Sequence, residues 1–302
     1  MHYDAALPMA PSFLTGQELS DEQLASLLER AAALKAGRPA AGGEALAGKS
    51  VALIFEMPST RTRISFEVGV AEMGGTPVVL RKDEMQLKRG EPIRDTAQVL
   101  SRFVHAIAIR SDSHANVSEL AEWAEVPVIN ALTELHHPCQ AIADLQTLNE
   151  RFGRLEGLKV AFVGDGNNVA RSLAIAGAKV GVEVVVSSPE GFTLDDTPEA
   201  TLVADPREAV AGADAIYTDV WVSLSEDEET AGPKREALAP YRVDDALLDA
   251  AGSDAIFLHC LPAHPGEEVT ADVLYGDRSA VWDQAENRLH AQKALLELLL
   301  AQ

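Results

Sequence analysis

The sequence predicts an α/β protein with two doubly wound, parallel-sheet domains joined by interdomain helices. Short apolar runs rich in Val, Leu and Ala alternate with segments of helical periodicity, a pattern typical of parallel strands covered by helices. The alternation restarts after a helical segment at residues 139–152, and 302 residues are enough for two domains of ordinary size. We therefore expect one sheet in each half of the chain.

The first half begins with a helix expected at residues 19–34, where Ser20 and Gln23 form a capping box. A loop rich in Gly, Ala and Pro follows at residues 37–48. The strands expected in this half lie at 51–55, 76–80, 106–109 and 126–129. One further helix is expected to start near residue 64, and three others to cover 95–103, 117–123 and 139–152.

The second half opens with a strand expected at residues 158–163. The turn Gly164-Asp165-Gly166-Asn167-Asn168 then leads into a helix that runs to about residue 180. Later elements are strands at 183–186, 215–217 and 255–259 and a final helix at 288–300. Because ligands of such folds bind at the carboxyl ends of the strands, polar residues at these positions are candidates for a site.

Composition excludes several classes of protein. The net charge of −22 disfavours binding to nucleic acid or to an anionic membrane, since both require clustered Lys and Arg. Cys139 and Cys260 lie far apart, so we expect no disulfide framework and favour the reducing cytoplasm. We expect neither a signal peptide nor a membrane span, because the most apolar stretch, residues 294–301, is short and contains Glu297.

An anion-binding motif lies shortly after the first predicted strand. Ser59-Thr60-Arg61-Thr62-Arg63 places three hydroxyls and two guanidinium groups where a helix starts and its backbone N–H groups are unpaired. Arg supplies a planar fork that matches phosphate oxygens, and the helix dipole favours an anion at the same point. The alternative is a hydroxyl-rich helix cap with Arg63 paired to Glu67 on the helix surface.

Three more clusters follow predicted strands. Arg110 comes directly after the strand at 106–109, and His136-His137-Pro138-Cys139-Gln140 follows the strand at 126–129. His137 and Gln140, three positions apart at a helix start, can reach one polar ligand. The last cluster, His259-Cys260-Leu261-Pro262-Ala263-His264, ends an apolar strand.

Two other interpretations of these motifs remain open. The His and Cys residues suit zinc and thus a metal hydrolase, although no Cys-x-x-Cys or His-x-x-x-His spacing is present. The glycine turn suits a nicotinamide dinucleotide and an oxidoreductase. However, Val169 stands where a third small residue is expected, and the following strand ends in Ser187-Ser188 without an acidic residue.

Taken together, the motifs resemble the aspartate/ornithine carbamoyltransferase family, and within it the ornithine carbamoyltransferases, over nearly the whole chain. They follow the family's order: Ser59-Thr60-Arg61-Thr62-Arg63, Gln86 within residues 85–91, His137-Pro138-Cys139-Gln140, the glycine turn, Asp219-Val220-Trp221-Val222-Ser223, His259-Cys260-Leu261-Pro262 and Glu286-Asn287-Arg288. The resemblance implies transfer of a carbamoyl group from carbamoyl phosphate to the side-chain amine of L-ornithine, giving L-citrulline and phosphate without cofactor or metal. We expect a role in arginine biosynthesis, and the sequence leaves citrulline breakdown open as the alternative direction.

The resemblance also implies roles for individual residues. The carbamoyl phosphate site would comprise Ser59, Thr60, Arg61, Thr62, Gln86, Arg110, His137, Gln140, Cys260, Leu261 and Arg288. Ornithine would be bound by Asn168, Asp219, Ser223 and Leu224, and the catalytic groups would be Arg61, Arg110, His137, Cys260 and Arg288. Gln86 would reach the site of a neighbouring subunit, which implies a homotrimer with shared sites and leaves a higher oligomer open. A carbamoyl phosphate domain at 1–147, rejoined by a helix at 287–302, and a Rossmann-like ornithine domain at 148–286 are expected.

Departures from the family pattern fall near the part that selects the amine. Leu224-Ser225 follows the Asp219 motif where relatives have Met-Gly, Pro265 replaces a frequent Arg, and Lys88 replaces a frequent Gly. Leu retains the volume and apolarity of Met, so ornithine stays the favoured amine. The alternatives within the family are carbamoyltransferases for putrescine or acetylornithine, and a noncatalytic homologue is disfavoured because the catalytic set is complete.

Overall fold

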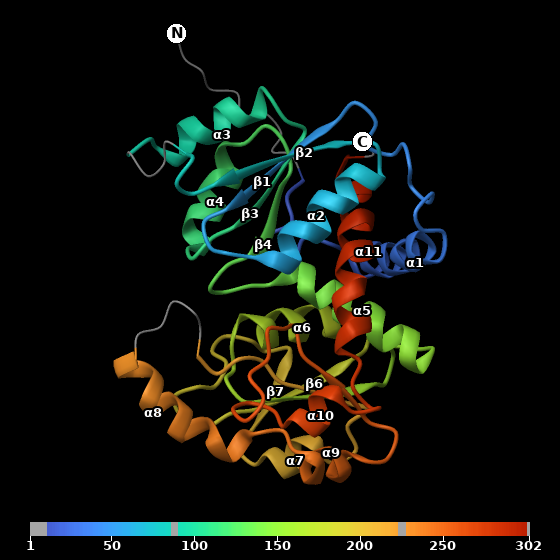
Figure 1. Ribbon diagram of the computed structural model, residues 1–302, viewed down its shortest axis with the longest axis vertical. Coiled ribbons are helices and arrows are strands. Elements are labelled where there is room, and N and C mark those ends of the chain that lie inside the picture. The colour runs from blue at the N-terminus through green and yellow to red at the C-terminus, as the bar shows by residue number, and fades with distance from the viewer. Residues whose placement is uncertain (1–10, 86–89, 223–227, 301–302) are drawn as a thin grey trace. The chain divides into compact units, whose positions relative to one another are not determined.

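The computed structural model describes residues 11–85, 90–222 and 228–300 (Figure 1). By its internal contacts the chain divides into two compact units. The first comprises Met1–Cys139 and Arg288–Gln302, and the second comprises Gln140–Asn287. Among the described residues, no helix is both long enough and apolar enough to cross a bilayer.

The first unit contains a four-stranded parallel sheet in the order β2-β1-β3-β4. Its strands are β1 (Ser50–Phe55), β2 (Thr76–Arg81), β3 (Ala106–Arg110) and β4 (Val128–Leu132), and its complete helices are α1 (Asp21–Ala36), α2 (Thr60–Glu72), α3 (Ile93–Ser101) and α4 (His114–Trp123). The strand order reverses between β1 and β3, which makes the carboxyl ends of these two strands the switch point where such sheets bind ligands.

Two further helices each begin in one unit and end in the other: α5 (Pro138–Phe152) and α11 (Val281–Leu300). In the first unit, α11 makes ionic contacts with α1 and α2. Lys293 Nζ, which is fully buried, lies 2.9 Å from Glu72 Oε2, and Arg30 binds both carboxylate oxygens of Glu297 at 2.9 and 3.0 Å. A Cβ on Gly69 would lie 3.2 Å from Lys293 Cγ, so this glycine allows the close packing of α2 on α11.

The second unit contains a five-stranded parallel sheet in the order β7-β6-β5-β8-β9. Its strands are β5 (Lys159–Val163), β6 (Glu183–Ser187), β7 (Ala200–Val203), β8 (Ala215–Tyr217) and β9 (Ile256–Leu258), and its other helices are α6 (Asn168–Ala178), α7 (Pro206–Val210), α8 (Glu228–Leu238), α9 (Asp245–Ala251), α10 (Ala271–Tyr275) and the short 3₁₀ helix Ala239–Tyr241. The order is that of a dinucleotide-type fold, with its switch point between β5 and β8.

The prediction of two parallel-sheet α/β domains is confirmed, with local differences. Strand β4 lies two to three residues later than predicted, because buried Asn130 continues the strand and donates from Nδ2 to the Leu14 carbonyl at 2.8 Å. Strand β7 and helices α7 to α10 were not predicted. Helix α11 begins at Val281, earlier than the predicted residue 288.

Candidate functional site

The anion-binding motif lies at the start of α2, as the sequence predicts. Ser59 is the N-cap residue and is extended, with φ −155° and ψ 112°, but its hydroxyl makes no capping hydrogen bond to the helix. Instead, Arg110 Nη1 lies 3.4 Å from Ser59 Oγ. Arg63 does pair with Glu67, with Nε 3.2 Å from Oε2. The alternative is therefore right in its Arg63–Glu67 pair and in the position of Ser59, but the Ser59 hydroxyl does not cap the helix.

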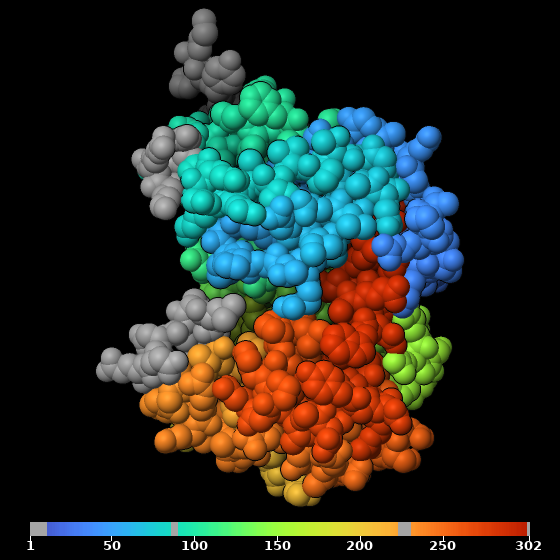
Figure 2. Space-filling model, viewed as in Figure 1, coloured from blue at the N-terminus to red at the C-terminus, as the bar shows by residue number. Residues whose placement is uncertain are grey.

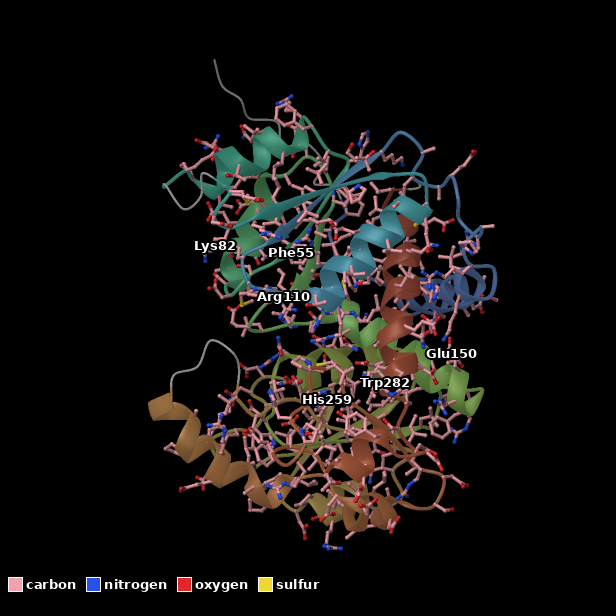
Figure 3. The ribbon with its side chains drawn as sticks, viewed as in Figure 1. Phe55, Lys82, Arg110, Glu150, His259 and Trp282 are labelled. Atoms are coloured by element: carbon pink, nitrogen blue, oxygen red, sulfur yellow. The ribbon has the colours of Figure 1, made fainter. Side chains whose placement is uncertain are left out.

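Arg110 reaches this motif because β1 and β3 are neighbours. Phe55 and Arg110 are register partners at the carboxyl ends of the two strands (Figure 3). The Glu56 N–H, directly after β1, donates to the Arg110 carbonyl at 3.0 Å. The switch point of the first sheet thus combines a helix N-terminus with a guanidinium group from the adjacent strand.

Arg288 joins the same motif from α11. Its Nη2 donates to Thr62 Oγ1 at 2.7 Å, and the two side chains are only 3% and 1% exposed. A hydroxyl that accepts from a guanidinium group still has its own O–H to donate. Thr62 is therefore oriented to donate to another acceptor, as a bound carbonyl or phosphate oxygen would require.

His137, which is buried, lies in the positive field of these arginines. Burial holds the pKa of His137 well below its ordinary value, and the charges of Arg288, Arg110 and Arg61 lower this pKa further. The imidazole is therefore neutral at neutral pH, and a neutral imidazole can donate one hydrogen bond without adding charge. Three guanidinium groups that act on one histidine form a cationic centre in a chain of net charge −22.

Cys139 and Gln140, which follow His137, have different surroundings. Cys139 is buried, and burial raises the pKa of its thiol to about 12, while its S–H donates to the Asn130 carbonyl at 3.4 Å. A thiol with such a pKa is a poor metal ligand and nucleophile. Gln140 belongs to the second unit, where its Nε2 donates to Asp144 Oδ1 at 2.8 Å.

In the second unit, the glycine turn after β5 packs closely on its neighbours. Gly164 has φ +127°, and a Cβ there would lie 3.2 Å from Thr218 Oγ1. At Gly166 a Cβ would lie 2.8 Å from both the Phe192 carbonyl oxygen and the Leu194 nitrogen. The space that a dinucleotide pyrophosphate would need beside this glycine is filled by the chain itself, which argues against the oxidoreductase alternative.

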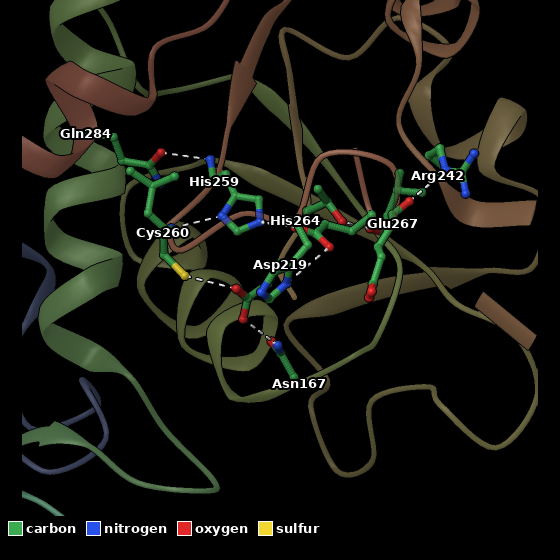
Figure 4. A network of polar contacts seen from close by, with 12 residues as sticks. Asn167, Asp219, Arg242, His259, Cys260, His264, Glu267 and Gln284 are labelled. Carbon is green, nitrogen blue, oxygen red and sulfur yellow. Dashed lines mark hydrogen bonds and ion pairs between the residues drawn. The ribbon is translucent and has the colours of Figure 1, made fainter. Parts of the chain in front are cut away.

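Asp219 follows β8 on the other side of the switch point. Its side chain is 8% exposed, and both carboxylate oxygens accept hydrogen bonds (Figure 4). Asn167 Nδ2 donates to Oδ2 at 2.7 Å, and Cys260 Sγ donates to Oδ1 at 3.1 Å. Strands β5, β8 and β9 are adjacent, so the loops that follow them bring these three residues together. A largely buried carboxylate of this kind suits recognition of an ammonium group.

Of these residues, Asn167 had no predicted role. The prediction assigned ornithine binding to Asn168, which is the first residue of α6. The sequence did indicate that Asn167 could cap a helix, since Asn is preferred at the position directly before one. That preference does not predict a contact with Asp219.

His259 is held between two groups at the end of β9. The Leu261 N–H donates to His259 Nδ1 at 2.9 Å, so the ring proton is on Nε2, which lies 3.3 Å from Glu268 Oε1. Leu261, a predicted site residue, has φ +60°, a backbone conformation that non-glycine residues rarely adopt and that occurs at functional sites.

Among the described residues, two groups have the ligand types and spacing of a metal site. The first is Asp219, His259 and Cys260. Its His259 Nδ1 already accepts from the Leu261 N–H, which disfavours coordination through this nitrogen. The second is His264, Glu267 and Glu268, but Arg235 Nε lies 3.3 Å from Glu267 Oε2 and its positive charge opposes a metal cation.

The predicted site residues therefore divide between the two units. The first unit contains Ser59, Thr60, Arg61, Thr62, Arg110, His137 and Arg288, and the second contains Gln140, Asn168, Asp219, Cys260 and Leu261. Gln86, Ser223 and Leu224 lie outside the described residues, as do Lys88 and Ser225.

Comparisons with known proteins bear on both units. The model for the carbamoyl-P binding domain of aspartate/ornithine carbamoyltransferase matches residues 12–150, and the model for the Asp/Orn binding domain matches residues 156–299. An ornithine carbamoyltransferase of Acidothermus cellulolyticus is 53% identical, with 97% of each chain covered. Solved ornithine carbamoyltransferases from Pyrococcus furiosus and Thermus thermophilus superpose with TM-scores of 0.92 and 0.89 at 47% and 44% identity. They cover 98% and 97% of this chain and 99% of each of their own.

Proposed function

Because the chain belongs to the aspartate/ornithine carbamoyltransferase family, we propose that it transfers the carbamoyl group of carbamoyl phosphate to the side-chain amine of L-ornithine. The products are L-citrulline and phosphate. The observation that carries the proposal is the cationic centre at the switch point of the first sheet, where Arg61, Arg110 and Arg288 surround a neutral His137. Such a centre suits the dianionic phosphate of the carbamoyl donor.

The first unit has the groups needed to activate the donor. Ser59, Thr60 and the N–H groups at the start of α2 bind phosphate oxygens, and Arg61 and Arg110 neutralise the phosphate charge. Thr62 and His137 donate hydrogen bonds to the carbamoyl oxygen, which polarises the carbonyl carbon. Further contacts to carbamoyl phosphate come from Gln86, Gln140, Cys260, Leu261 and Arg288.

The reaction itself is an acyl transfer to an amine. The neutral side-chain amine attacks the carbonyl carbon and forms a C–N bond, which gives a tetrahedral intermediate with negative charge on the carbamoyl oxygen. The carbonyl then re-forms as the C–O bond to phosphate breaks with its electron pair on the phosphate oxygen, and the proton of the amine nitrogen passes to the departing phosphate. Arg61, Arg110, His137, Cys260 and Arg288 are the catalytic groups, since they stabilise the intermediate and the leaving phosphate. No step requires a metal or a cofactor.

The second unit selects the amine. Asp219 binds the α-ammonium group of ornithine, and Asn168, Ser223 and Leu224 complete the contacts to its amino-acid end. Putrescine has no amino-acid end and acetylornithine has no α-ammonium group, so a carboxylate at this position favours ornithine over both. Within the same proposal, residues 1–147 with 287–302 form the carbamoyl phosphate domain, and residues 148–286 form the ornithine domain.

The proposal includes a homotrimer in which Gln86 reaches the site of a neighbouring subunit. A hollow of about 650 Å³ beside α2 and β2 supports it, because Ser59 and Thr60 of the anion-binding motif line it together with Ile64, which is 53% exposed. Figure 2 shows the chain segments of α2 and β2 at the molecular surface. Mass photometry should therefore find three copies of the 32.2 kDa chain or a multiple of three, and a monomer would contradict this part of the proposal.

We also place the reaction in arginine biosynthesis and the protein in the cytoplasm. The ureido group of citrulline supplies the carbon and two of the three nitrogen atoms of a guanidinium group, and two cysteines without a disulfide suit a reducing compartment.

The decisive experiment supplies carbamoyl phosphate with ornithine, putrescine, acetylornithine or aspartate and measures each carbamoylated product by mass spectrometry. We expect ornithine to be the best substrate, and another best amine would refute the specificity. Arg61→Ala should abolish turnover while the circular dichroism spectrum is unchanged. Unchanged activity of this variant would refute the assignment of the phosphate site.

A further inference from the structure

Asn167 has a different partner at each end of its side chain. Its Oδ1 accepts the N–H groups of Val169 at 2.9 Å and Ala170 at 3.3 Å, and so caps helix α6. Its Nδ2 donates to Asp219 Oδ2 at 2.7 Å (Figure 4). Since only the amide oxygen can accept from an N–H group, the cap determines that the amide NH₂ faces Asp219.

The backbone that carries Asn167 is closely constrained. The Gly164 N–H donates to the Ser187 carbonyl at 2.9 Å, and the Gly166 N–H donates to the Phe192 carbonyl at 2.8 Å. The tight contacts at both glycines leave the turn little freedom to shift. The amide of Asn167 is therefore fixed relative to the sheet before any ligand binds.

We infer that Asn167 is a positioning residue that orients the Asp219 carboxylate toward the α-ammonium group of the amino-acid substrate. The inference rests on the proposed function and deepens it, because it identifies the group that connects the substrate-binding carboxylate to the N-terminus of α6. Cys260 donates to the other carboxylate oxygen, so the Asp219 carboxylate is held in one orientation. A third hydrogen-bond donor, such as the substrate ammonium group, then meets this carboxylate from a defined direction.

The chemistry of helix capping explains why the residue is Asn. Ser, Thr, Asp and Asn all cap helices well. Ser and Thr are too short to cap α6 and also reach Asp219, and Asp would place a second carboxylate against the first. Of the four, only Asn both accepts from the helix and donates to the carboxylate.

Two variants separate the two functions of the side chain. Asn167→Ser and Asn167→Asp both retain an oxygen that can cap α6, but neither supplies the N–H donor to Asp219. In each, we expect the KM for ornithine to rise at least about tenfold, since a charge-assisted hydrogen bond is lost. The Kd for carbamoyl phosphate should stay within about twofold. In Asn167→Ser, which retains the cap, Tm should fall only by the contribution of the lost hydrogen bond to Asp219.

The pH profile of Asn167→Asp provides a readout that a structural role alone would not change. Two carboxylates at this distance cannot both ionise, so the pair retains a proton to a higher pH than a single carboxylate does. The protonated form can donate as Asn167 does. The ratio of variant to wild-type kcat/KM for ornithine should therefore rise as the pH falls from about 8 to about 6.

Asp244→Ala is the matched control, because Asp244 Oδ1 caps α9 through the Leu247 N–H at 2.9 Å. It should lower Tm without changing the KM for ornithine. A wild-type KM for ornithine in Asn167→Ser would overturn the inference. Equal losses of affinity for both substrates, together with a Tm as low as that of Asp244→Ala, would also overturn it. If the wild-type protein forms no citrulline, the proposed function fails first and the inference with it.

Discussion

Replacing Thr62 with valine tests how α11 contributes to the anion-binding motif. Valine has a similar shape but removes the oxygen that accepts from Arg288 Nη2 at 2.7 Å, and it also removes the hydroxyl's O–H donor. The matched control is Thr62→Ser, which keeps the hydroxyl and loses only a methyl group.

The expected size of the effect follows from burial and charge. Thr62 is almost fully buried, and a hydrogen bond that its O–H donates to the negatively charged carbamoyl oxygen of the intermediate contributes about 1.5–3 kcal/mol. Since 1.36 kcal/mol corresponds to a factor of ten, kcat/KM for carbamoyl phosphate should fall about 10- to 150-fold in Thr62→Val. In Thr62→Ser it should stay within about threefold of wild type.

The assay measures initial rates of citrulline formation with carbamoyl phosphate varied at saturating ornithine. Urea unfolding of both variants reports the stability, which should fall by about 1–3 kcal/mol in Thr62→Val because Arg288 loses a buried acceptor. Equal kcat/KM values in Thr62→Val and Thr62→Ser would refute the argument that the Arg288 contact orients the hydroxyl.

Three other predictions concern single side chains. Arg63→Ala should leave turnover within about twofold of wild type, since its half-buried pair with Glu67, four residues apart on one helix, contributes only about 0.3–0.5 kcal/mol; a loss as large as that of Arg61→Ala would contradict this. Ellman's reagent should react with Cys260 in the native protein and with Cys139 only after denaturation, because Cys139 is buried and its thiol pKa is about 12. Rapid reaction of two thiols in the native protein would be inconsistent with that burial. The folded chain holds the pKa of His137 below its ordinary value of 6.5. As the pH falls below about 6.5, the unfolded chain therefore takes up a proton on this residue before the folded chain does, and the free energy of unfolding decreases. His137→Gln should therefore show a shallower loss of unfolding free energy between about pH 7 and 5, and an identical slope would show that His137 is not the group responsible.

The elements that the sequence predicts well are those whose burial is uniform. Strand β1 was predicted at residues 51–55 and is buried along nearly its whole length, as a strand covered on both faces must be. Strand β7 was missed because Thr201 and Leu202 are exposed at the edge of the sheet, which removes the apolar signal. Helix α8 contains Gly232 and Pro233, which normally terminate helices.

The start of α11 was missed for a different reason. Gln284 and Asn287 are buried, and their side chains are satisfied by polar partners: Gln284 Nε2 donates to Asp144 and Asn287 Nδ2 donates to Thr147. A buried polar face of this kind interrupts the apolar periodicity on which a helix prediction depends.

The candidate site was predicted where its residues follow strands directly. Arg110 and the motif after β1 needed only the strand positions and the rule that parallel strands share one carboxyl edge. The role of Asn167 depends on Asp219, which is distant in sequence, and on the orientation of an amide. Neither can be inferred from local sequence patterns.

The return of α11 to the first unit has a consequence for how the chain is made. The second unit is continuous in sequence, whereas the first needs residues 288–300, which are synthesised after the whole second unit. At ordinary ribosomal rates this delay is on the order of ten seconds or more, during which Glu72 and Arg30 lack their partners Lys293 and Glu297. The unit that emerges first from the ribosome is thus the one that completes its core last.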